Sequence, residues 1–408
     1  MRVLYHHRTR GRHVEGVHIR GIVGALRQQG HEVRVLSFPG ADPEAEPGLA
    51  EAAAGAATAG GDRAAGDDQA TAGNGRGWLA SLVTRLPGVV FEFAELAYNL
   101  VTWWRIRAEI ARDRPDFIYE RYSLFLFMTI RMARRRGIPI ILEINDSALV
   151  ERVRPLYLKA LSRRIERWCL TRATGLVFIS TYFRDLLTEH YGQLPPGVVS
   201  PNAVDARFDP SVHDREALRR RHDLAGRVVC GHVGVFARWH GVSRFVDEVI
   251  DRLREVPALT LLLVGDGVDL PGVRREVRAR GLDDRIRLPG RVPHHLVPEW
   301  IACMDYAFLP DSNEYGSPMK LFELMAMGVA VVAPDYDPVA EVIDDGATGW
   351  LFPRKDMKAC VDRVLELASQ PDERDRVGKA AQAYIERERR WQHNADQLLG
   401  LLPEPMPQ

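Results

Sequence analysis

The sequence has few cysteines and no surplus of charge of one sign. Its four cysteines, Cys169, Cys230, Cys303 and Cys360, lie far apart without paired spacing, which argues against a disulfide framework or a thiolate metal site. Lysine plus arginine and aspartate plus glutamate both number 55, so no net field favours nucleic acid as a partner. We therefore expect a reducing compartment, no metal and no nucleic acid.

Long apolar runs are also scarce. Met1 is followed by a basic residue and a short strand, Val3 to Tyr5, without the apolar segment of a secretory signal, so the cytoplasm is the expected location. The segment from Leu86 to Trp104 is rich in aromatic residues, but Glu92 and Glu95 interrupt it, so we do not expect it to span a bilayer.

That aromatic segment is either core or an interfacial helix. Two basic stretches, Arg131 to Arg136 and Lys159 to Arg172, could face anionic headgroups or a phosphate-bearing acceptor, or they could simply be solvated helix faces. Peripheral contact with the inner face of a membrane therefore stays open.

The length of 408 residues suggests two domains. Residues 41–77 consist almost only of small and polar residues, too poor in large side chains to offset the entropy of ordering. We predict a flexible insertion inside the first domain, either a mobile lid or filler.

Apart from that insertion, short apolar strands alternate with helices, which indicates an α/β fold with two doubly wound, Rossmann-like sheets. We predict an N-terminal domain over residues 1–200, a C-terminal domain over 201–384, and a helical segment over 385–408 that packs back on the first domain. Ligands bind at the carboxyl ends of parallel strands, so the function is expected in a cleft between the two domains.

The expected strands fall into two series. They are 3–5, 32–36, 117–119, 138–144 and 176–179, followed by 228–234, 260–264, 286–288, 306–309 and 330–333.

A segment late in the chain combines a turn, a helix start and a buried strand. Ser317 and Pro318 are typical of the N-cap and first residue of a helix, whose free backbone N–H groups would face an anion. Glu323 follows one to two turns later, where its carboxylate can accept hydrogen bonds from hydroxyls. Gly328 ends the helix, and the apolar run 329–333 predicts a buried strand. A phosphate beside such a carboxylate is the pattern of a nucleotide's diphosphate and ribose.

Three glycine-containing turns precede that segment. In residues 231–242 a strand ends in glycines and a basic loop leads into a helix, which could hold a diphosphate or be an ordinary strand-to-helix turn. The second turn covers residues 262–267, and the third, 290–294, follows another strand.

With these turns in order before Ser317, the chain resembles the retaining family 4 glycosyltransferases, which have the GT-B architecture of two Rossmann-like domains facing each other across a cleft. The resemblance covers nearly the whole chain apart from residues 41–77. Further matching segments are 30–33, 115–122, 142–145, 200–205 and 344–351. The resemblance implies transfer of a sugar from a nucleotide diphosphate sugar, with retention at the anomeric carbon and without a cofactor or a metal.

The resemblance also implies a donor site, in which backbone groups around Val292 and Pro293 would contact the base. The residues assigned to this site are Gly16, Gly234, Arg238, His240, Gly241, Gly265, Val292, Pro293, Tyr315, Gly316, Ser317, Pro318, Met319, Lys320, Leu321 and Glu323.

Two cations that the family usually places in the first turn are replaced here by Val235 and His240. Arg238, in the same loop, and Lys320, at the helix start, could supply the charge that a diphosphate needs. His240 would help when protonated or as a neutral donor. Alternatively, Arg238 is a solvated loop arginine.

The family's first glutamate also has no direct counterpart. Counting eight positions back from Glu323 reaches Tyr315 (323 − 8), and Glu314 is one position off. Either Glu314 is shifted into place to contact the donor sugar, or Tyr315 and neighbouring amides do so. A surface carboxylate is an equal alternative for Glu314.

In the first domain the resemblance implies catalytic roles for His18 and Asn145, beside Glu314. His18 and Gly16 open a helix after the first strand and could approach the donor. Asn145 stands where many relatives have a histidine, and its amide can hydrogen-bond a sugar hydroxyl. The pairs Glu120 with Arg121 and Glu143 with Asp146 could line the acceptor side, or each could be a structural ion pair.

The mechanism that the resemblance implies needs no dedicated base, because the leaving phosphate itself takes the acceptor proton and the protein stabilises the charge that grows there. The acceptor would be a glycan, a lipid-linked sugar or a small molecule, in polysaccharide, glycoconjugate or natural-product assembly. Two alternatives remain: a nucleotide-sugar epimerase of the same architecture, and a non-catalytic nucleotide-sugar-binding protein.

Overall fold

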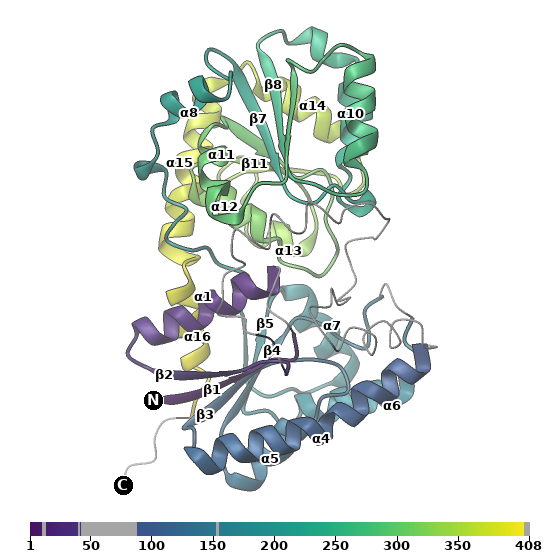
Figure 1. The fold of residues 1–408 in the computed structure, drawn as a ribbon, viewed down its shortest axis with the longest axis vertical. Coiled ribbons are helices and arrows are strands. Elements are labelled where there is room, and N and C mark those ends of the chain that lie inside the picture. Colours follow the sequence, from purple (N-terminus) through teal and green to yellow (C-terminus); the bar gives the residue numbers. More distant parts are fainter. Residues whose placement is uncertain (10–13, 40, 42–87, 152–154, 404–408) are drawn as a thin grey trace, which may run out of the picture. The chain divides into compact units, whose positions relative to one another are not determined.

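The computed structural model describes residues 1–9, 14–39, 41, 88–151 and 155–403, which form two compact units (Figure 1). The first unit contains the described residues up to Ser200 and those from Gln392 onward, and the second contains Pro201–Trp391. The insertion predicted over 41–77 lies, except for Ala41, outside the described residues.

The first unit is built on one six-stranded, wholly parallel sheet of order β2-β1-β3-β4-β5-β6. Its strands are β1 (Arg2–His6), β2 (Glu32–Leu36), β3 (Phe117–Arg121), β4 (Ile140–Ile144), β5 (Gly175–Phe178) and β6 (Gly197–Val199). Its helices include α1 (Val14–Gln28), α4 (Gly88–Arg112), α5 (Met128–Arg136), α6 (Lys159–Leu170) and α7 (Thr181–Tyr191).

The second unit has another parallel six-stranded sheet, of order β12-β11-β10-β7-β8-β9. Its strands are β7 (Val228–Val233), β8 (Leu259–Val264), β9 (Ile286–Gly290), β10 (Tyr306–Phe308), β11 (Val331–Pro334) and β12 (Trp350–Phe352). Its helices include α8 (Arg215–Arg221), α9 (Val242–Val249), α10 (Leu270–Ala279), α11 (Val297–Ala302), α12 (Met319–Ala326), α13 (Asp337–Ala340), α14 (Met357–Leu367) and α15 (Pro371–Glu388).

Both sheets are buried on both faces, which explains why their strands are continuous apolar runs. All six residues of β8 are buried. Leu262 and Val264 pack into one core cluster, while Leu261 and Leu263 pack into another, because successive side chains of a strand point to opposite faces. The predicted fold class, two Rossmann-like doubly wound domains, is confirmed.

Each sheet has a point where the strand order reverses. In the second unit the chain proceeds from β7 to β9 on one side and then starts β10 on the other side of β7; in the first unit β3 starts on the other side of β1. Open α/β sheets bind ligands outside the carboxyl ends of their strands at such a point. The residues after β1, β3, β7 and β10 therefore lie where a ligand is expected.

The ends of the elements differ from the sequence prediction in places. The three-residue strands β6 and β12 were not predicted, because such short runs carry no readable pattern. The second unit continues to Trp391, and α15 runs unbroken to Glu388, whereas the expected boundary was at 384. The last helix, α16 (Trp391–Leu399), belongs mostly to the first unit, where Gln29 donates a hydrogen bond to Asp396 over 2.7 Å.

The described helices include none that is both long and apolar enough to cross a membrane. The four cysteines are free and buried.

Candidate functional site

Two glycine turns lie against each other at the carboxyl edge of the second sheet. Gly234, after β7, has φ +151°, and Gly265, after β8, has φ +147°. A Cβ on Gly265 would lie 1.8 Å from the carbonyl oxygen of Gly234, a separation that real atoms never reach. Both positions therefore require glycine, and the two turns approach more closely than side chains would permit.

Lys320, in the first turn of α12, reaches the Gly234 turn. A Cβ on Gly234 would lie 2.7 Å from Lys320 Nζ. Desolvation lowers the pKa of Lys320 to about 8, although Glu323 acts in the opposite direction. No carboxylate among the described residues forms an ion pair with Lys320, so its positive charge is available to an anion.

His240 Nδ1 lies 3.3 Å from Lys320 Nζ. Burial and the neighbouring lysine lower the pKa of His240 to about 3, so the imidazole is neutral at physiological pH. Because an ammonium group can only donate, Nδ1 accepts from the lysine and Nε2 carries the hydrogen. Of the two roles that the sequence left open for His240, the neutral donor is the one that this geometry allows.

The start of α12 differs from the sequence prediction. Pro318 is extended (φ −77°, ψ 110°) and is itself the N-cap, so Ser317 lies outside the helix. The Ser317 hydroxyl accepts a hydrogen bond from the backbone N–H of Asn202, and the Asn202 amide donates to the Ser317 carbonyl. The prediction of Ser317 as the N-cap was wrong, because its hydroxyl is hydrogen-bonded to Asn202 and Pro318 takes the N-cap position. Asn202 belongs to the matched segment 200–205, but its role could not be read from spacing.

Glu323 is buried one turn after Lys320 and on the same side of α12. Its Oε1 lies 2.9 Å from His294 Nε2, on the 3₁₀ turn η4 (His294–Leu296) that follows β9. Val292 and Pro293 immediately precede that histidine, and Val292 packs against the core. The sequence pointed to residues 290–294 as a turn but did not identify His294 as the partner of Glu323.

Residues 313–316 form a tight loop before α12. The Asn313 side-chain oxygen accepts hydrogen bonds from the N–H groups of Tyr315 and Gly316. Glu314 is exposed and Tyr315 is partly buried. The loop geometry therefore turns the two amides toward Asn313, which the sequence had not singled out, and leaves the Glu314 carboxylate in solvent.

The other residues that the sequence assigned to the donor site are either exposed or packed inside the fold. The side chain of Arg238 is exposed on η2 (Arg238–His240) and forms no hydrogen bond or ion pair with another described residue, while the Arg238 carbonyl accepts from the N–H of Gly241. Gly241 joins η2 to α9 at φ +72°. Leu321 is fully buried and its N–H donates to the Pro318 carbonyl, and Met319 is also buried. The assignment of both residues to the donor site stays a prediction.

In the first unit, Glu143 at the end of β4 collects three donors. His18 Nε2 lies 2.8 Å from Oε2, the Tyr119 hydroxyl donates to Oε2 over 2.9 Å, and the Arg121 guanidinium pairs with Oε1. Although burial alone would raise it, the charges of His18 and Arg121 lower the pKa of Glu143 to about 2. The glutamate is therefore a permanent anion whose charge its neighbours compensate.

Asn145 supports the same cluster. In the amide orientation that satisfies both of its polar atoms, its oxygen accepts from Arg121 Nη2 over 3.2 Å and its nitrogen donates to the carbonyls of Tyr122 and Glu143. Gly16 and His18 both lie in the first turns of α1 and are buried. The structure thus brings His18, Glu143, Arg121 and Asn145 together.

The pairs that the sequence suggested are not the observed ones. Glu120 and Arg121 are consecutive on β3 and point to opposite faces, so Glu120 binds His6 Nδ1 at 2.5 Å while Arg121 binds Glu143. Glu143 likewise does not pair with Asp146, whose carboxylate accepts from the N–H of Ser147. Because β1 and β3 place His6 beside Glu120 in register, this second pair depends on strand order and not on sequence spacing.

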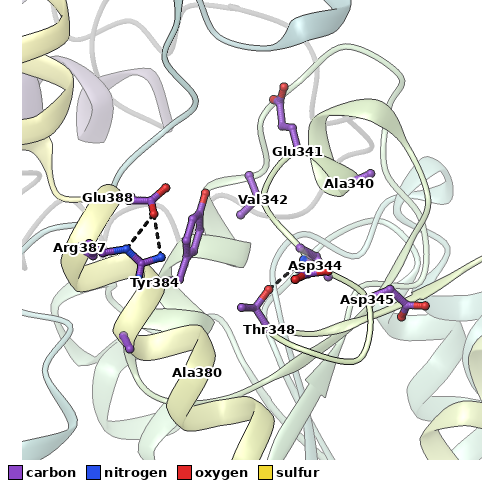
Figure 2. Close-up of a pocket in the computed structure, with 12 residues that line it drawn as sticks. Ala340, Glu341, Val342, Asp344, Asp345, Thr348, Ala380, Tyr384, Arg387 and Glu388 are labelled. Atoms are coloured by element: carbon purple, nitrogen blue, oxygen red, sulfur yellow. Dashed lines mark hydrogen bonds and ion pairs between the residues drawn. The ribbon is translucent and has the colours of Figure 1, made fainter.

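A pocket elsewhere in the second unit contains none of these residues. Figure 2 shows that it lies between α15, which contributes Tyr384 and Arg387, and the loop that carries Asp344 and Thr348. Its charged side chains are mostly carboxylates, which disfavour a diphosphate. They are Glu341, Asp344, Asp345 and Glu388, with Arg387 as the cation.

The chain matches two glycosyltransferase families. Residues 16–208 match the family described as Glycosyltransferase Family 4, and residues 227–370 match the family described as Glycosyl transferases group 1.

Within the described residues, no group of three histidine, cysteine, aspartate or glutamate side chains could hold a metal ion.

Curated relatives include the alpha-D-kanosaminyltransferase of Streptomyces kanamyceticus, 26% identical over 68% of this chain and 74% of that protein. A GDP-mannose-dependent alpha-(1-6)-phosphatidylinositol monomannoside mannosyltransferase of Mycobacterium tuberculosis is 26% identical over 56% of this chain and 61% of that protein. A 2-deoxystreptamine glucosyltransferase of S. kanamyceticus is matched over 63% of its length, so the chain spans less than two thirds of two of these three relatives.

Solved structures share the fold at low sequence identity. The Anabaena protein HepE in complex with UDP has a TM-score of 0.65 at 16% identity, covering 98% of this chain and 100% of that one. The sucrose-phosphate synthase of Thermosynechococcus elongatus has a TM-score of 0.67 at 16% identity, with 98% of both chains covered. These likenesses show the fold. The two family matches, which together cover residues 16–208 and 227–370, and the curated relatives lead to one conclusion: the chain belongs to the family 4 glycosyltransferases.

Proposed function

We propose that this protein is a retaining, metal-independent glycosyltransferase that moves a sugar from a nucleotide diphosphate sugar to an acceptor hydroxyl in glycoconjugate or natural-product assembly. The observation that carries the donor half of this proposal is Lys320, a cation without an ion pair that faces the Gly234 turn. A desolvated ammonium group suits a diphosphate, which needs both positive charge and hydrogen-bond donors.

Glu323 supplies the second half of the donor site. Its carboxylate lies one helical turn beyond Lys320 and accepts from His294. A ribose offers two adjacent hydroxyl donors, which could replace or share that hydrogen bond, because a carboxylate has about four acceptor positions. The spacing of Lys320 and Glu323 then corresponds to the diphosphate and ribose of one nucleotide.

The reaction follows from charge placement. The bond between the anomeric carbon and the donor phosphate oxygen breaks, the acceptor oxygen forms its bond on the same face, and the acceptor proton passes to the leaving phosphate. Negative charge grows on the phosphate, where Lys320 Nζ and His240 Nε2–H would stabilise it in a partly dehydrated site. The ammonium group of Lys320, aided by the neutral donor His240, would thus perform the part that a divalent cation performs in other transferases.

The acceptor side is assigned to the first unit. There the Glu143 cluster presents the ring of His18 and the guanidinium of Arg121, both held by one carboxylate. Groups whose charge is already compensated favour hydrogen bonds to neutral hydroxyls over binding of a further ion. A sugar or a polyhydroxylated small molecule is the acceptor class that fits. By their names, the two curated relatives of Streptomyces kanamyceticus are an alpha-D-kanosaminyltransferase and a 2-deoxystreptamine glucosyltransferase, and the second name gives a small polyhydroxylated acceptor.

A thermal-shift panel of nucleotide diphosphate sugars tests the proposal. We expect at least one donor to raise the melting temperature, and Glu323→Ala to weaken its binding by about ten- to a hundredfold, which corresponds to one or two charge-assisted hydrogen bonds. Glu299→Ala, which removes a half-exposed carboxylate from the neighbouring helix α11, is the matched control and should leave the shift intact.

The outcomes separate the alternatives. An unchanged shift in Glu323→Ala would remove the ribose role. Donor binding without transfer to any acceptor would favour a binding protein, and epimerised donor in the absence of acceptor would favour an epimerase. Retention is tested by the anomeric configuration of the product, and metal independence by full activity in excess chelator.

A further inference from the structure

Helix α4 of the first unit exposes a row of large apolar side chains. Phe93, Leu100 and Trp104 have exposed fractions of 57%, 66% and 66%, and Val90 and Val101 are each 39% exposed. The spacing of positions 90, 93, 97, 100 and 104 alternates between three and four residues, so they form one stripe along the helix. Scattered exposed apolar residues are ordinary, but a stripe of this length on one helix is not.

The polar residues of α4 explain why the stripe faces outward. Glu92 is buried and accepts hydrogen bonds from the N–H groups of Tyr157 and Leu158, just before α6. Glu95 pairs with Arg8, and Glu109 pairs with Arg34. The three carboxylates are therefore turned to protein partners, and the apolar residues occupy the opposite side. The N-terminal part of α4 is thus inverted relative to an ordinary surface helix, while Ile106 and Ile110 pack inward nearer its C-terminal end.

Two neighbouring helices surround this stripe with positive charge. Figure 1 shows α4, α5 and α6 along the same side of the first unit, and Phe127, the N-cap residue of α5, contacts Trp168 of α6 at 6.4 Å between ring centroids. The exposed cations of the three helices are Arg107, Arg112, Arg131, Arg134, Arg135, Arg136, Lys159, Arg163, Arg164 and Arg167.

No exposed carboxylate balances these cations on the three helices. Helix α5 has no acidic residue, and the single acidic residue of α6, Glu166, is buried and accepts from Tyr191 and Ser147. A chain with equal numbers of acidic and basic residues overall has thus concentrated positive charge on one face. Tyr157 and Leu161, 58% and 40% exposed, extend the apolar surface to the start of α6.

We propose that this face, formed by α4, α5 and α6, binds the surface of a bilayer that contains anionic lipids. The apolar stripe would enter the boundary between headgroups and acyl chains, where aromatic side chains are favoured, and the arginines would contact lipid phosphates. Nucleic acid would bind the cations but would not bury the apolar stripe of α4. An acidic protein would likewise leave most of the stripe exposed to water. The inference is independent of the donor site, which lies in the other unit.

Vesicle co-sedimentation tests the inference with the full chain. We expect binding to vesicles of phosphatidylcholine containing phosphatidylglycerol, little binding to pure phosphatidylcholine, and loss of binding as salt rises. Arg131→Gln, Arg135→Gln and Arg136→Gln together should weaken binding on the order of a hundredfold. Phe93→Ser, Leu100→Ser and Trp104→Ser together should weaken it by at least about tenfold.

Matched variants of the second unit serve as controls. Arg220→Gln, Arg275→Gln and Arg278→Gln remove three exposed arginines, and Val212→Ser with Val268→Ser removes two exposed apolar residues. These controls should bind vesicles as the unmodified protein does.

Three outcomes would overturn the inference. They are equal binding to both kinds of vesicle, an equal loss in the controls, and no binding to either vesicle. Conversion of a dimer to a monomer by the α4 variant, measured by light scattering, without vesicle binding would identify a second copy as the occupant and would also overturn it. Donor thermal shifts should be unchanged in every variant, which separates this test from that of the donor site.

Discussion

Both parallel sheets carry a candidate site at their carboxyl edge, but the two sites differ in whether their charges are compensated. At the carboxyl edge of the first sheet, charged side chains bind one another: His18 and Arg121 converge on Glu143. At the same edge of the second sheet, glycines replace side chains, and Lys320 stands without an ion pair among the described residues. A compensated cluster suits a neutral, polyhydroxylated ligand, whereas an uncompensated cation suits an anion.

The largest effect should come from filling the space between the glycine turns of the second unit. In Gly265→Val the new side chain would overlap the Gly234 carbonyl, so the backbone must move. We expect a loss of several kcal/mol in the free energy of unfolding and no measurable donor binding. Urea unfolding and calorimetric titration measure the two effects. Gly272→Ala, where the nearest atom is 3.9 Å away, should be nearly neutral. A stable, donor-binding Gly265→Val would mean that the turns can separate.

The next effect concerns the compensated cluster. Glu143→Gln leaves the buried Arg121 without its anion and should lower the free energy of unfolding at pH 7 by about 3 kcal/mol. Because the pKa of Glu143 is lowered from 4.5 to about 2, the stabilisation is complete above pH 4.5 and is lost as the pH falls toward 2. The variant should therefore have a flatter stability profile over that range.

Asp185→Asn is the control for that experiment, since its carboxylate is 66% exposed on α7 and forms an ion pair with the neighbouring Arg184. A loss as small as that of the control would show that the cluster contributes little to stability. In that case charge compensation around Glu143 would not distinguish the first unit from the second.

A smaller effect should follow from removing the uncompensated cation. Lys320→Met should weaken donor binding by roughly thirtyfold. Because burial lowers the pKa of Lys320 to about 8, donor affinity of the unmodified protein should be constant below pH 8 and fall up to about tenfold per unit above it. Titration with a nucleotide diphosphate sugar, whose phosphates do not ionise in this range, measures both. Lys358→Met is the control, because the side chain of Lys358 is exposed on α14. An affinity independent of pH up to 9.5 would contradict the role of Lys320.

The smallest effect is expected for Arg238→Gln. The side chain is exposed on η2 and can reach the diphosphate only through solvent-screened contact, so we expect about a threefold loss of affinity. A loss as large as that of Lys320→Met would show that the η2 loop closes over the donor.

Much of the fold could be predicted from apolar runs alone. Strands such as Glu32–Leu36 and Leu259–Val264 are long enough and apolar enough to stand out, whereas the three-residue strands β6 and β12 form only because neighbouring strands offer hydrogen bonds. The glycines at 234 and 265 were also recognisable, because a turn between a strand and a helix often demands one.

The pairing of side chains was less accessible. Glu120 and Arg121 are adjacent in sequence, yet strand alternation sends one to His6 and the other to Glu143. Ser317 has the identity of an N-cap, but a residue more than a hundred positions away uses its hydroxyl. His294 and Glu323 meet because the turn after β9 lies beside the start of α12.

By itself, the sequence determined the two α/β domains and the glycine turns, because apolar periodicity and backbone demands are local properties. Only the tertiary structure decided that His240 is a neutral donor, that Glu143 gathers His18 and Arg121, and that α4 turns its carboxylates inward and Phe93 and Trp104 outward. The physical reason is that charge state and exposure depend on which groups become neighbours in space, and parallel strand order brings together residues that are distant in the chain.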